Sequence, residues 1–257
     1  MCGFPDEMAP ETWIDWDAIA SALAAMAPLW TPGTANGYHP QTAGLIAGEL
    51  IRRVRGRTIG EILRADYFAA RGVDVHCGLK DDASARASYM PKPRSAPDLG
   101  PISDFKKYAF LTPWAAPAKV AREAWMAAEL PASNMHATAK GLAEILHPLA
   151  APEATPADLR LDPAAVTAAL APRIEGDDLV LPFHLTWAAG VMLNRSGHFG
   201  PDPSGFGHAG FGGSCVLIAP ERRLTAAYVM NRMSPHLVGD PRAVRLLDAL
   251  YHGLGGA

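Results

Sequence analysis

The stretch Phe206-Gly207-His208-Ala209-Gly210-Phe211-Gly212-Gly213-Ser214 places four glycines in a segment that otherwise has the composition of a strand. Glycine inside a strand indicates a bulge or a close approach by another backbone or a ligand. Two interpretations are open. In the functional one, a substrate lies along this edge and the backbone N–H of Phe211 faces a developing oxyanion. In the structural one, the glycines serve only the geometry of a tight hairpin.

The segments after this stretch predict a small antiparallel sheet closed by a helix. Residues 214–219 and 224–230 have strand composition and flank the turn Pro220-Glu221-Arg222-Arg223. Short strand-like runs begin earlier, near Asp178. Asp240-Pro241 starts a last helix whose apolar face can pack on the sheet; that face carries Val244, Leu247 and Tyr251.

The first two thirds of the chain are predicted to be mainly helical. Asp15 is the expected N-cap of a first helix, and Gly56 the expected end of a second whose apolar face is Ile46, Leu50 and Val54. Thr58 and Glu61 form the capping box of a third. Helical periodicity returns at residues 120–128 and 142–149 and after Asp162-Pro163. The Pro-rich stretch near 80–119 is expected to be a surface excursion with little regular structure.

The predicted fold class is therefore α+β. We expect residues 1–257 to form a single domain, with a mainly helical part over about 12–175 and a sheet part over about 178–257.

The amino-acid composition limits the classes of binding partner that we expect. The chain has 257 residues, 49% of them hydrophobic, and 23 Lys and Arg against 26 Asp and Glu give a formal net charge of -3. Such a balance creates no long-range field for nucleic acid or an anionic bilayer, so a small molecule is the expected partner. Oligomeric state is not predicted. The three cysteines, Cys2, Cys77 and Cys215, lack metal or redox spacing. With no signal-like or membrane-spanning run, they predict free thiols and a cytoplasmic location.

The stretch around His208 carries a resemblance to a known family. His208-Ala209-Gly210, then Gly213-Ser214, a strand, Ala219-Pro220-Glu221 and a second strand ending in Asn231, resembles the His-x-Gly variant of the Lys-Thr-Gly box. This variant occurs in beta-lactamase-related esterases and class C-like serine hydrolases. The resemblance implies a beta-lactamase/transpeptidase-like fold, acyl-ester hydrolysis through an acyl-enzyme, and no cofactor. It assigns substrate binding and oxyanion stabilisation to His208, Gly210 and Phe211.

A second resemblance lies upstream, where Trp30-Thr31-Pro32-Gly33-Thr34 precedes Tyr38-His39-Pro40. The segment is similar to the one that carries the tyrosine of the family's Tyr-x-Asn motif, which makes Tyr38 the implied base or proton relay. A phenol with an ordinary pKa near ~10 needs cationic neighbours to act as a base at neutral pH. Pro40 replaces the asparagine, which favours an esterase over a true beta-lactamase. The structural alternative for Tyr38 is a loop aromatic packed on Trp30.

The nucleophile of the family is missing from the expected place. The family carries it in a Ser-x-x-Lys before the tyrosine, and the residues before Tyr38 contain no such motif. The string Ser103-Asp104-Phe105-Lys106 lies after the tyrosine, in a polar context without an apolar helix, so we interpret it as a chance match. His136, His147 and His184 lack metal-ligand spacing, and no metal site is predicted.

Two functions remain open from the sequence. In one, the chain is an N-terminally truncated, esterase-like serine hydrolase, inactive as it stands, whose nucleophile is encoded upstream. In the other, it is a non-catalytic scaffold that keeps Tyr38 and the box at His208–Gly210 and binds a small ligand or partner.

Overall fold

A computed structural model describes residues 1–80, 82–117 and 119–255. The chain divides into two compact units, and each is built from more than one stretch of sequence. Unit 1 comprises residues 1–87, 99–137 and 178–182, and unit 2 comprises residues 88–98, 138–177 and 183–257. Both helices and antiparallel strands are present, which confirms the predicted α+β class.

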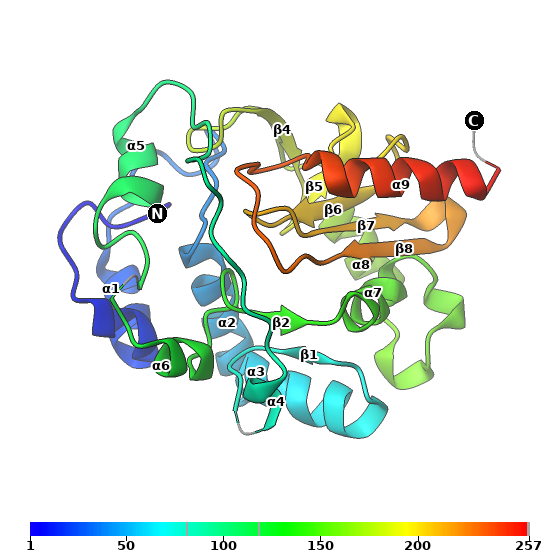
Figure 1. Cartoon of the computed structure of the whole chain (residues 1–257), viewed down its shortest axis with the longest axis horizontal. Coiled ribbons are helices and arrows are strands. Elements are labelled where there is room, and N and C mark those ends of the chain that lie inside the picture. The colour runs from blue at the N-terminus through cyan, green and yellow to red at the C-terminus, as the bar shows by residue number, and fades with distance from the viewer. Residues whose placement is uncertain (81, 118, 256–257) are drawn as a thin grey trace. The chain divides into compact units, whose positions relative to one another are not determined.

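Unit 1 is mainly helical (Figure 1). Short π-helical turns at Leu63–Ala69 and Lys107–Leu111 extend two of its helices. Its elements are α1 (Trp16–Ala25), α2 (Thr42–Arg55), α3 (Ile59–Ile62), β1 (Val75–His76), α4 (Asp82–Ala85), α5 (Asp104–Lys106), α6 (Arg122–Ala127) and β2 (His136–Ala137).

The predicted helix signals in unit 1 are confirmed where they concern caps. The Asp15 side chain accepts a hydrogen bond from the backbone N–H of Ala18, which fixes the start of α1. Thr58 and Glu61 form the reciprocal capping box of α3. Gly56 ends α2 in the left-handed conformation that favours glycine.

The stretch near 80–119 is more regular than predicted. It contains α4, α5 and the π-helical turn that follows α5. Local caps explain this difference, because the Ser103 hydroxyl accepts a hydrogen bond from the Lys106 backbone N–H and starts α5 inside a polar stretch. The two-stranded pair of β1 and β2 was also not predicted, because two-residue strands leave no periodic signal.

Of the predicted apolar face of α2, only Ile46 packs on the core of unit 1. Leu50 and Val54 are 61% and 80% exposed, whereas Leu45 is buried with Ile19 and Leu23 of α1. The start of α2 packs on α1, and Gly48 lies against the ring of Trp16. The spacing of four was therefore right for Ile46 and wrong for the two residues that follow it on the helix.

Truncation of the two faces should give opposite results. We expect Leu45→Ala to lower the free energy of unfolding by about 2–4 kcal/mol, because it leaves a cavity in the core of unit 1. Leu50→Ala, the matched control one helical face away, should change it by less than about 0.5 kcal/mol. Urea titration followed by circular dichroism measures both. Equal losses would show that the assigned face is incorrect.

Unit 2 is built on a six-stranded antiparallel sheet in sequential order. Its strands are β3 (Ile174–Asp177), β4 (His184–Trp187), β5 (Met192–Leu193), β6 (Phe206–Ala209), β7 (Cys215–Ala219) and β8 (Leu224–Tyr228), and its helices are α7 (Ala139–Leu146), α8 (Pro163–Leu170) and α9 (Pro241–Gly253). The predicted hairpin is confirmed as β7 and β8, and the predicted terminal helix as α9.

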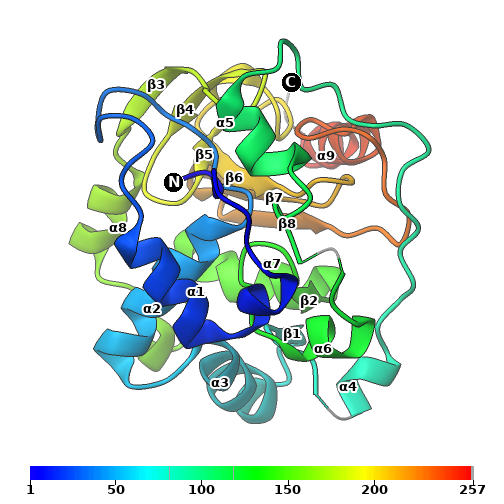
Figure 2. The same cartoon turned by 90° about the vertical axis from the view of Figure 1, so that its left-hand side faces the viewer.

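Helices cover both faces of this sheet. Figures 1 and 2 show α9 on one side of β7 and β8, and α7 on the other. Phe206 and Ile218 are paired in register and bury against Leu146, Leu149 and Leu170 of the α7 and α8 side. Because strand side chains alternate, His208, two residues after Phe206, points to this same side. The box residues are thereby set on a sheet packed on both faces.

Candidate active-site residues and their surroundings

Tyr38 lies in the loop before α2, and a buried carboxylate holds the backbone of this loop. Asp178 Oδ1 accepts a hydrogen bond from the Tyr38 backbone N–H at 2.9 Å. Asp178 Oδ2 accepts another from the Asn36 side-chain amide at 3.1 Å, and the Asn36 carbonyl accepts from the Leu179 N–H. No local pattern indicates this role, because Asp178 lies 140 residues after Tyr38 in the chain.

The Tyr38 side chain is half-buried and packs with Trp30 against a core formed by Cys2, Ala109 and Val180. Burial, and secondly the negative charge of Asp178, raise the pKa of Tyr38 to about 12. Tyr38 is therefore a neutral phenol at neutral pH. The phenolate, which is the form that would act as a base, is therefore populated even less at neutral pH than in free tyrosine.

Neighbouring His39 is tied to the backbone on both sides. Its Nδ1 contacts the Gly37 carbonyl at 2.6 Å, and its Nε2 contacts the N-terminal amine of Met1 at 2.9 Å. Burial, followed by the charge of that amine, lowers the pKa of His39. This arrangement indicates a structural role for His39.

The side chains of Ser103 and Lys106 both make hydrogen bonds to the backbone around the start of α5. Ser103 is the N-cap of α5, and the Lys106 amine donates to the backbone carbonyls of Leu99 and Pro101. An amine that donates to two backbone carbonyls is not directed at the serine hydroxyl. The geometry supports our interpretation of this string as a chance match.

The His208 box forms the turn between β6 and β7. The Gly210 N–H donates to the Ser214 carbonyl at 2.8 Å, and the Gly213 N–H donates back to the Gly210 carbonyl at 3.0 Å. Gly212 has φ +103°, a conformation that favours glycine. Gly207 faces the backbone carbonyl of Val216 so closely that a side chain would not fit. Much of the glycine pattern is thus explained by chain geometry.

Phe211 and His208 have different surroundings within the box. No described residue accepts a hydrogen bond from the Phe211 backbone N–H, and the Phe211 side chain is 42% exposed. His208 Nδ1 donates to the Ala209 carbonyl at 2.8 Å, and its ring lies 6.0 Å from that of Trp187, centroid to centroid. Burial lowers the pKa of His208, so the ring is neutral at neutral pH.

The box is braced by an ion pair that sequence reasoning missed. Arg242 Nη2 donates to the Gly212 carbonyl and to Asp240 Oδ2, both at 2.8 Å, and Nη1 donates to the Arg232 carbonyl at 2.9 Å. The Ser234 hydroxyl also donates to Asp240. The sequence indicated a helix start at Asp240-Pro241. It did not indicate the hydrogen bond from Arg242 to the Gly212 carbonyl, because the two residues are 30 positions apart in the chain.

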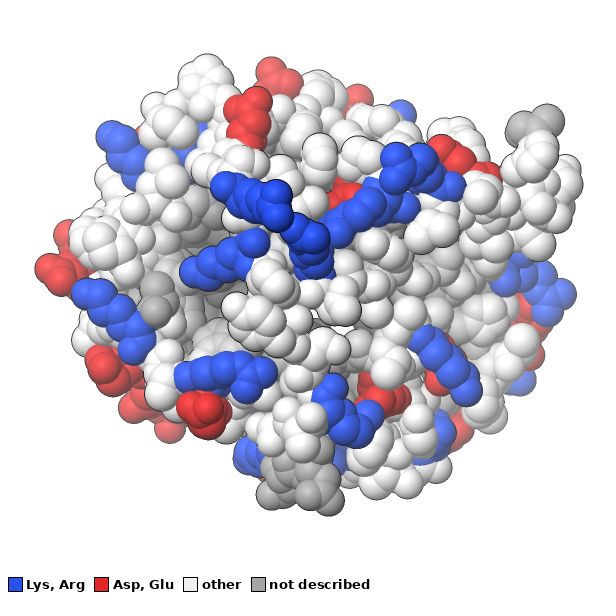
Figure 3. Space-filling model, viewed as in Figure 1, with Lys and Arg blue, Asp and Glu red and all other residues white. Residues whose placement is uncertain are grey.

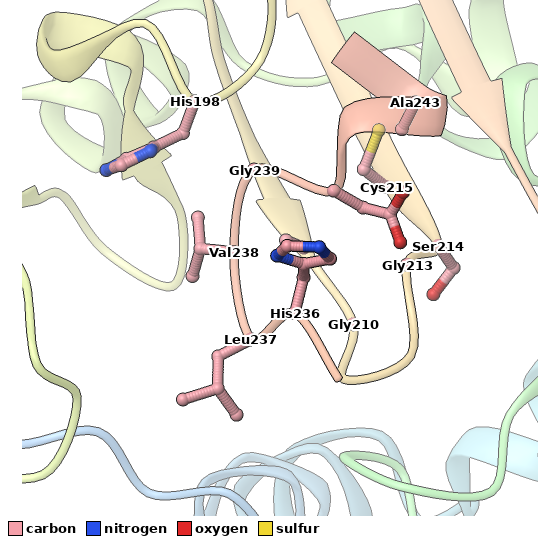
Figure 4. Close-up of a pocket in the computed structure, with 12 residues that line it drawn as sticks. His198, Gly210, Gly213, Ser214, Cys215, His236, Leu237, Val238, Gly239 and Ala243 are labelled. Carbon is pink, nitrogen blue, oxygen red and sulfur yellow. The ribbon is translucent and has the colours of Figure 1, made fainter. Parts of the chain in front are cut away.

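A small recess lies behind the box, between the turn at Gly210–Ser214 and the loop at His236–Asp240 (Figure 4). Its lining includes His198, Cys215 and His236. Burial lowers the pKa of His198 and raises that of the Cys215 thiol to about 11, so neither group is charged at neutral pH. Asp240 also lines the recess, and its negative charge is balanced by the ion pair with Arg242.

Among the residues that the structure describes, no three His, Cys, Asp or Glu side chains are grouped to hold a metal ion. In the same part of the chain, no helix has both the length and the apolar character needed to span a bilayer. Cys2, Cys77 and Cys215 are buried free thiols, as the sequence predicted.

The family follows from comparison with known proteins. The profile of the family described as Beta-lactamase matches residues 2–251. This chain belongs to the beta-lactamase family. The predicted relationship to beta-lactamase-related serine hydrolases, and the beta-lactamase/transpeptidase-like fold, are confirmed. No curated protein matches the chain.

Three solved structures are similar to this beta-lactamase family member. A novel penicillin-binding protein homologue from Caulobacter crescentus is 45% identical with a TM-score of 0.92, over 98% of this chain and 67% of that one. A family VIII carboxylesterase is 32% identical, with a TM-score of 0.86 and the same coverage. EstA from Arthrobacter nitroguajacolicus Rue61a is 25% identical with a TM-score of 0.80, over 99% of this chain and 69% of that one. The chain thus spans about two thirds of each.

Proposed function

We propose that this chain carries the acyl-ester-binding part of an esterase-like serine hydrolase, and that by itself it binds esters without turning them over. The family assignment and the similarity to a family VIII carboxylesterase support the hydrolase class. The single observation that carries ester binding is the Phe211 backbone N–H, which has no acceptor among the described residues and lies in a turn fixed by Arg242. A donor held in this way needs no reorganisation to bind an ester carbonyl oxygen.

In this proposal each of four residues has a separate role. Phe211 donates its backbone N–H to the carbonyl oxygen, Gly210 lets the acyl group approach the backbone, and neutral His208 lines the α7 side of the box. Tyr38 acts as a proton relay in its neutral form, because its raised pKa leaves almost none of the phenolate that a base would need. The free thiols support a reducing, cytoplasmic location.

The second candidate is a scaffold that binds a small ligand without any hydrolysis. The raised pKa of Tyr38 favours it, because it leaves little phenolate to act as a base. The two candidates differ in what the genome encodes before Met1. An in-frame Ser-x-x-Lys there supports the hydrolase, whereas a stop codon just upstream supports the scaffold.

A burst assay tests the proposal directly. The 257-residue chain is mixed with 4-nitrophenyl butyrate in a stopped-flow instrument, and 4-nitrophenolate release is recorded. We expect no burst, because no activated serine is available to form an acyl-enzyme. A ketone analogue of the ester should still raise the melting temperature in proportion to the logarithm of its concentration.

Three variants show which residues are responsible for ligand binding and for any burst. Gly212→Ala should abolish the ketone-induced shift, because a side chain at φ +103° distorts the turn that presents Phe211. Ser103→Ala and Tyr38→Phe should match the parent chain in the burst assay. A stoichiometric burst that Tyr38→Phe removes would show that the chain is catalytic alone, and a burst that Ser103→Ala removes would identify Ser103 as nucleophile.

A further inference from the structure

The His208 box is continuous with a surface formed by two other segments of unit 2. The Ser234 N–H donates to the Gly212 carbonyl at 3.0 Å, which joins the box to the chain after β8. The Met233 N–H donates to the Pro91 carbonyl at 3.2 Å, which joins that chain to residues 88–98. We call residues 88–94, 210–213 and 229–236 together the box-side surface.

Apolar side chains are exposed along the box-side surface. Tyr89 is 77% exposed, Met90 43%, Phe211 42% and Val229 37%. Beneath them, the side chains of Met230 and Met233 approach Gly212 and are half-buried. Contiguous exposed apolar groups are uncommon on soluble proteins and mark binding sites. Methionine side chains adapt readily to different apolar ligands.

The same surface carries cations and lacks anions. Lys92, Arg94 and Arg232 are exposed, and none of them forms an ion pair with a described residue. Residues 88–97 and 229–239 contain no Asp or Glu. Figure 3 shows Lys and Arg side chains gathered over the start of α9 and the loop before it. The local charge is thus positive although the net charge of the chain is -3.

We propose that the box-side surface binds a single-chain anionic amphiphile, with its apolar chain along Phe211, Met230 and Met233 and its carboxylate or phosphate at Lys92, Arg94 and Arg232. Burial of the chain supplies the affinity, and the unpaired cations select the anionic head. The inference rests on the proposed function, because the surface begins at Phe211. It narrows the ester class to those whose apolar part carries an anionic group.

Calorimetric titration tests the inference without any need for turnover. The chain is titrated with dodecyl phosphate, and separately with dodecyl maltoside, each below the concentration at which it forms micelles. We expect dodecyl phosphate to bind at least about tenfold more tightly, and only its affinity to fall as salt is raised. Lys92→Gln with Arg94→Gln should weaken dodecyl phosphate about tenfold and leave dodecyl maltoside unchanged.

The matched control removes two exposed cations elsewhere in unit 2. Lys140 and Arg195 have side chains that are 84% and 52% exposed, and Lys140→Gln with Arg195→Gln should leave both affinities unchanged. Equal binding of the two amphiphiles, or equal losses in the two double variants, would overturn the inference. If dodecyl phosphate binds as expected while the ketone analogue does not, the proposed function fails and the anionic surface stands.

Discussion

Asp178→Ala should unfold the Tyr38 loop and lower the free energy of unfolding by about 3–5 kcal/mol. The carboxylate is buried, and besides Asn36 and Tyr38 it accepts the backbone N–H groups of Val180 and Leu181, both at 2.9 Å. Alanine leaves all four donors without this acceptor. Urea unfolding of unit 1, followed by tryptophan fluorescence, measures the loss.

The isosteric variant separates hydrogen bonding from charge. In Asp178→Asn the remaining oxygen can keep the three backbone N–H groups that Oδ1 accepts, so we expect a loss of only about 1 kcal/mol. Asp177→Asn is the control, because Asp177 is the exposed neighbour and should change stability by less than about 0.5 kcal/mol. If Asp178→Ala is as mild as Asp177→Asn, the carboxylate does not hold the loop.

Asp240→Ala should lower the free energy of unfolding by about 2–4 kcal/mol and disorder the box, because the half-buried Arg242 loses its carboxylate partner. Arg242 then no longer holds the Gly212 carbonyl in place. Backbone amide exchange of residues 210–214 should accelerate together with the loss of stability. Arg242→Lys, which keeps the charge but not the two-pronged geometry, should produce a smaller change in both.

The ion pair of Asp240 and Arg242 should make the free energy of unfolding depend on pH. Burial disfavours the charged form of Asp240, but hydrogen bonds from Arg242 and Ser234 outweigh it and hold the pKa at about 2. The unfolded value is near ~3.9, so the stabilisation is complete above about pH 4 and is lost as pH falls toward 2. Unfolding at a series of pH values should show the parent chain exceeding Asp240→Asn by about 2 kcal/mol at neutral pH and converging with it near pH 2. A constant difference would refute the assigned pKa.

The sequence predicted the elements whose signals are local. The caps at Asp15, Thr58 and Asp240 and the hairpin turn at Pro220 depend on neighbouring residues, and the structure has each of them. The prediction that Leu50 and Val54 of α2 are buried was wrong because burial is not a local property. Whether Leu45 or Leu50 is buried depends on where α1 lies, which no spacing within α2 records.

In the candidate site, too, the sequence predicted local features and missed long-range contacts. The residues Tyr38, His208, Gly210 and Phe211 were predicted from two ordered segments, and their catalytic roles stay predictions. The surroundings that set their chemistry came from the tertiary structure, because a carboxylate 140 residues away from Tyr38 holds its backbone, and with burial raises the pKa of the phenol. A guanidinium 30 residues away from Gly212 fixes the turn that presents Phe211.

By itself the sequence determined the family resemblance, the α+β class and the absence of a Ser-x-x-Lys before Tyr38, since motif order and local caps are written in consecutive residues. Only the tertiary structure decided which residues hold the box, that Tyr38 is a neutral phenol, and that cations and apolar groups gather beside Phe211. The physical reason is that burial, long-range hydrogen bonds and local charge arise between segments that only folding brings together.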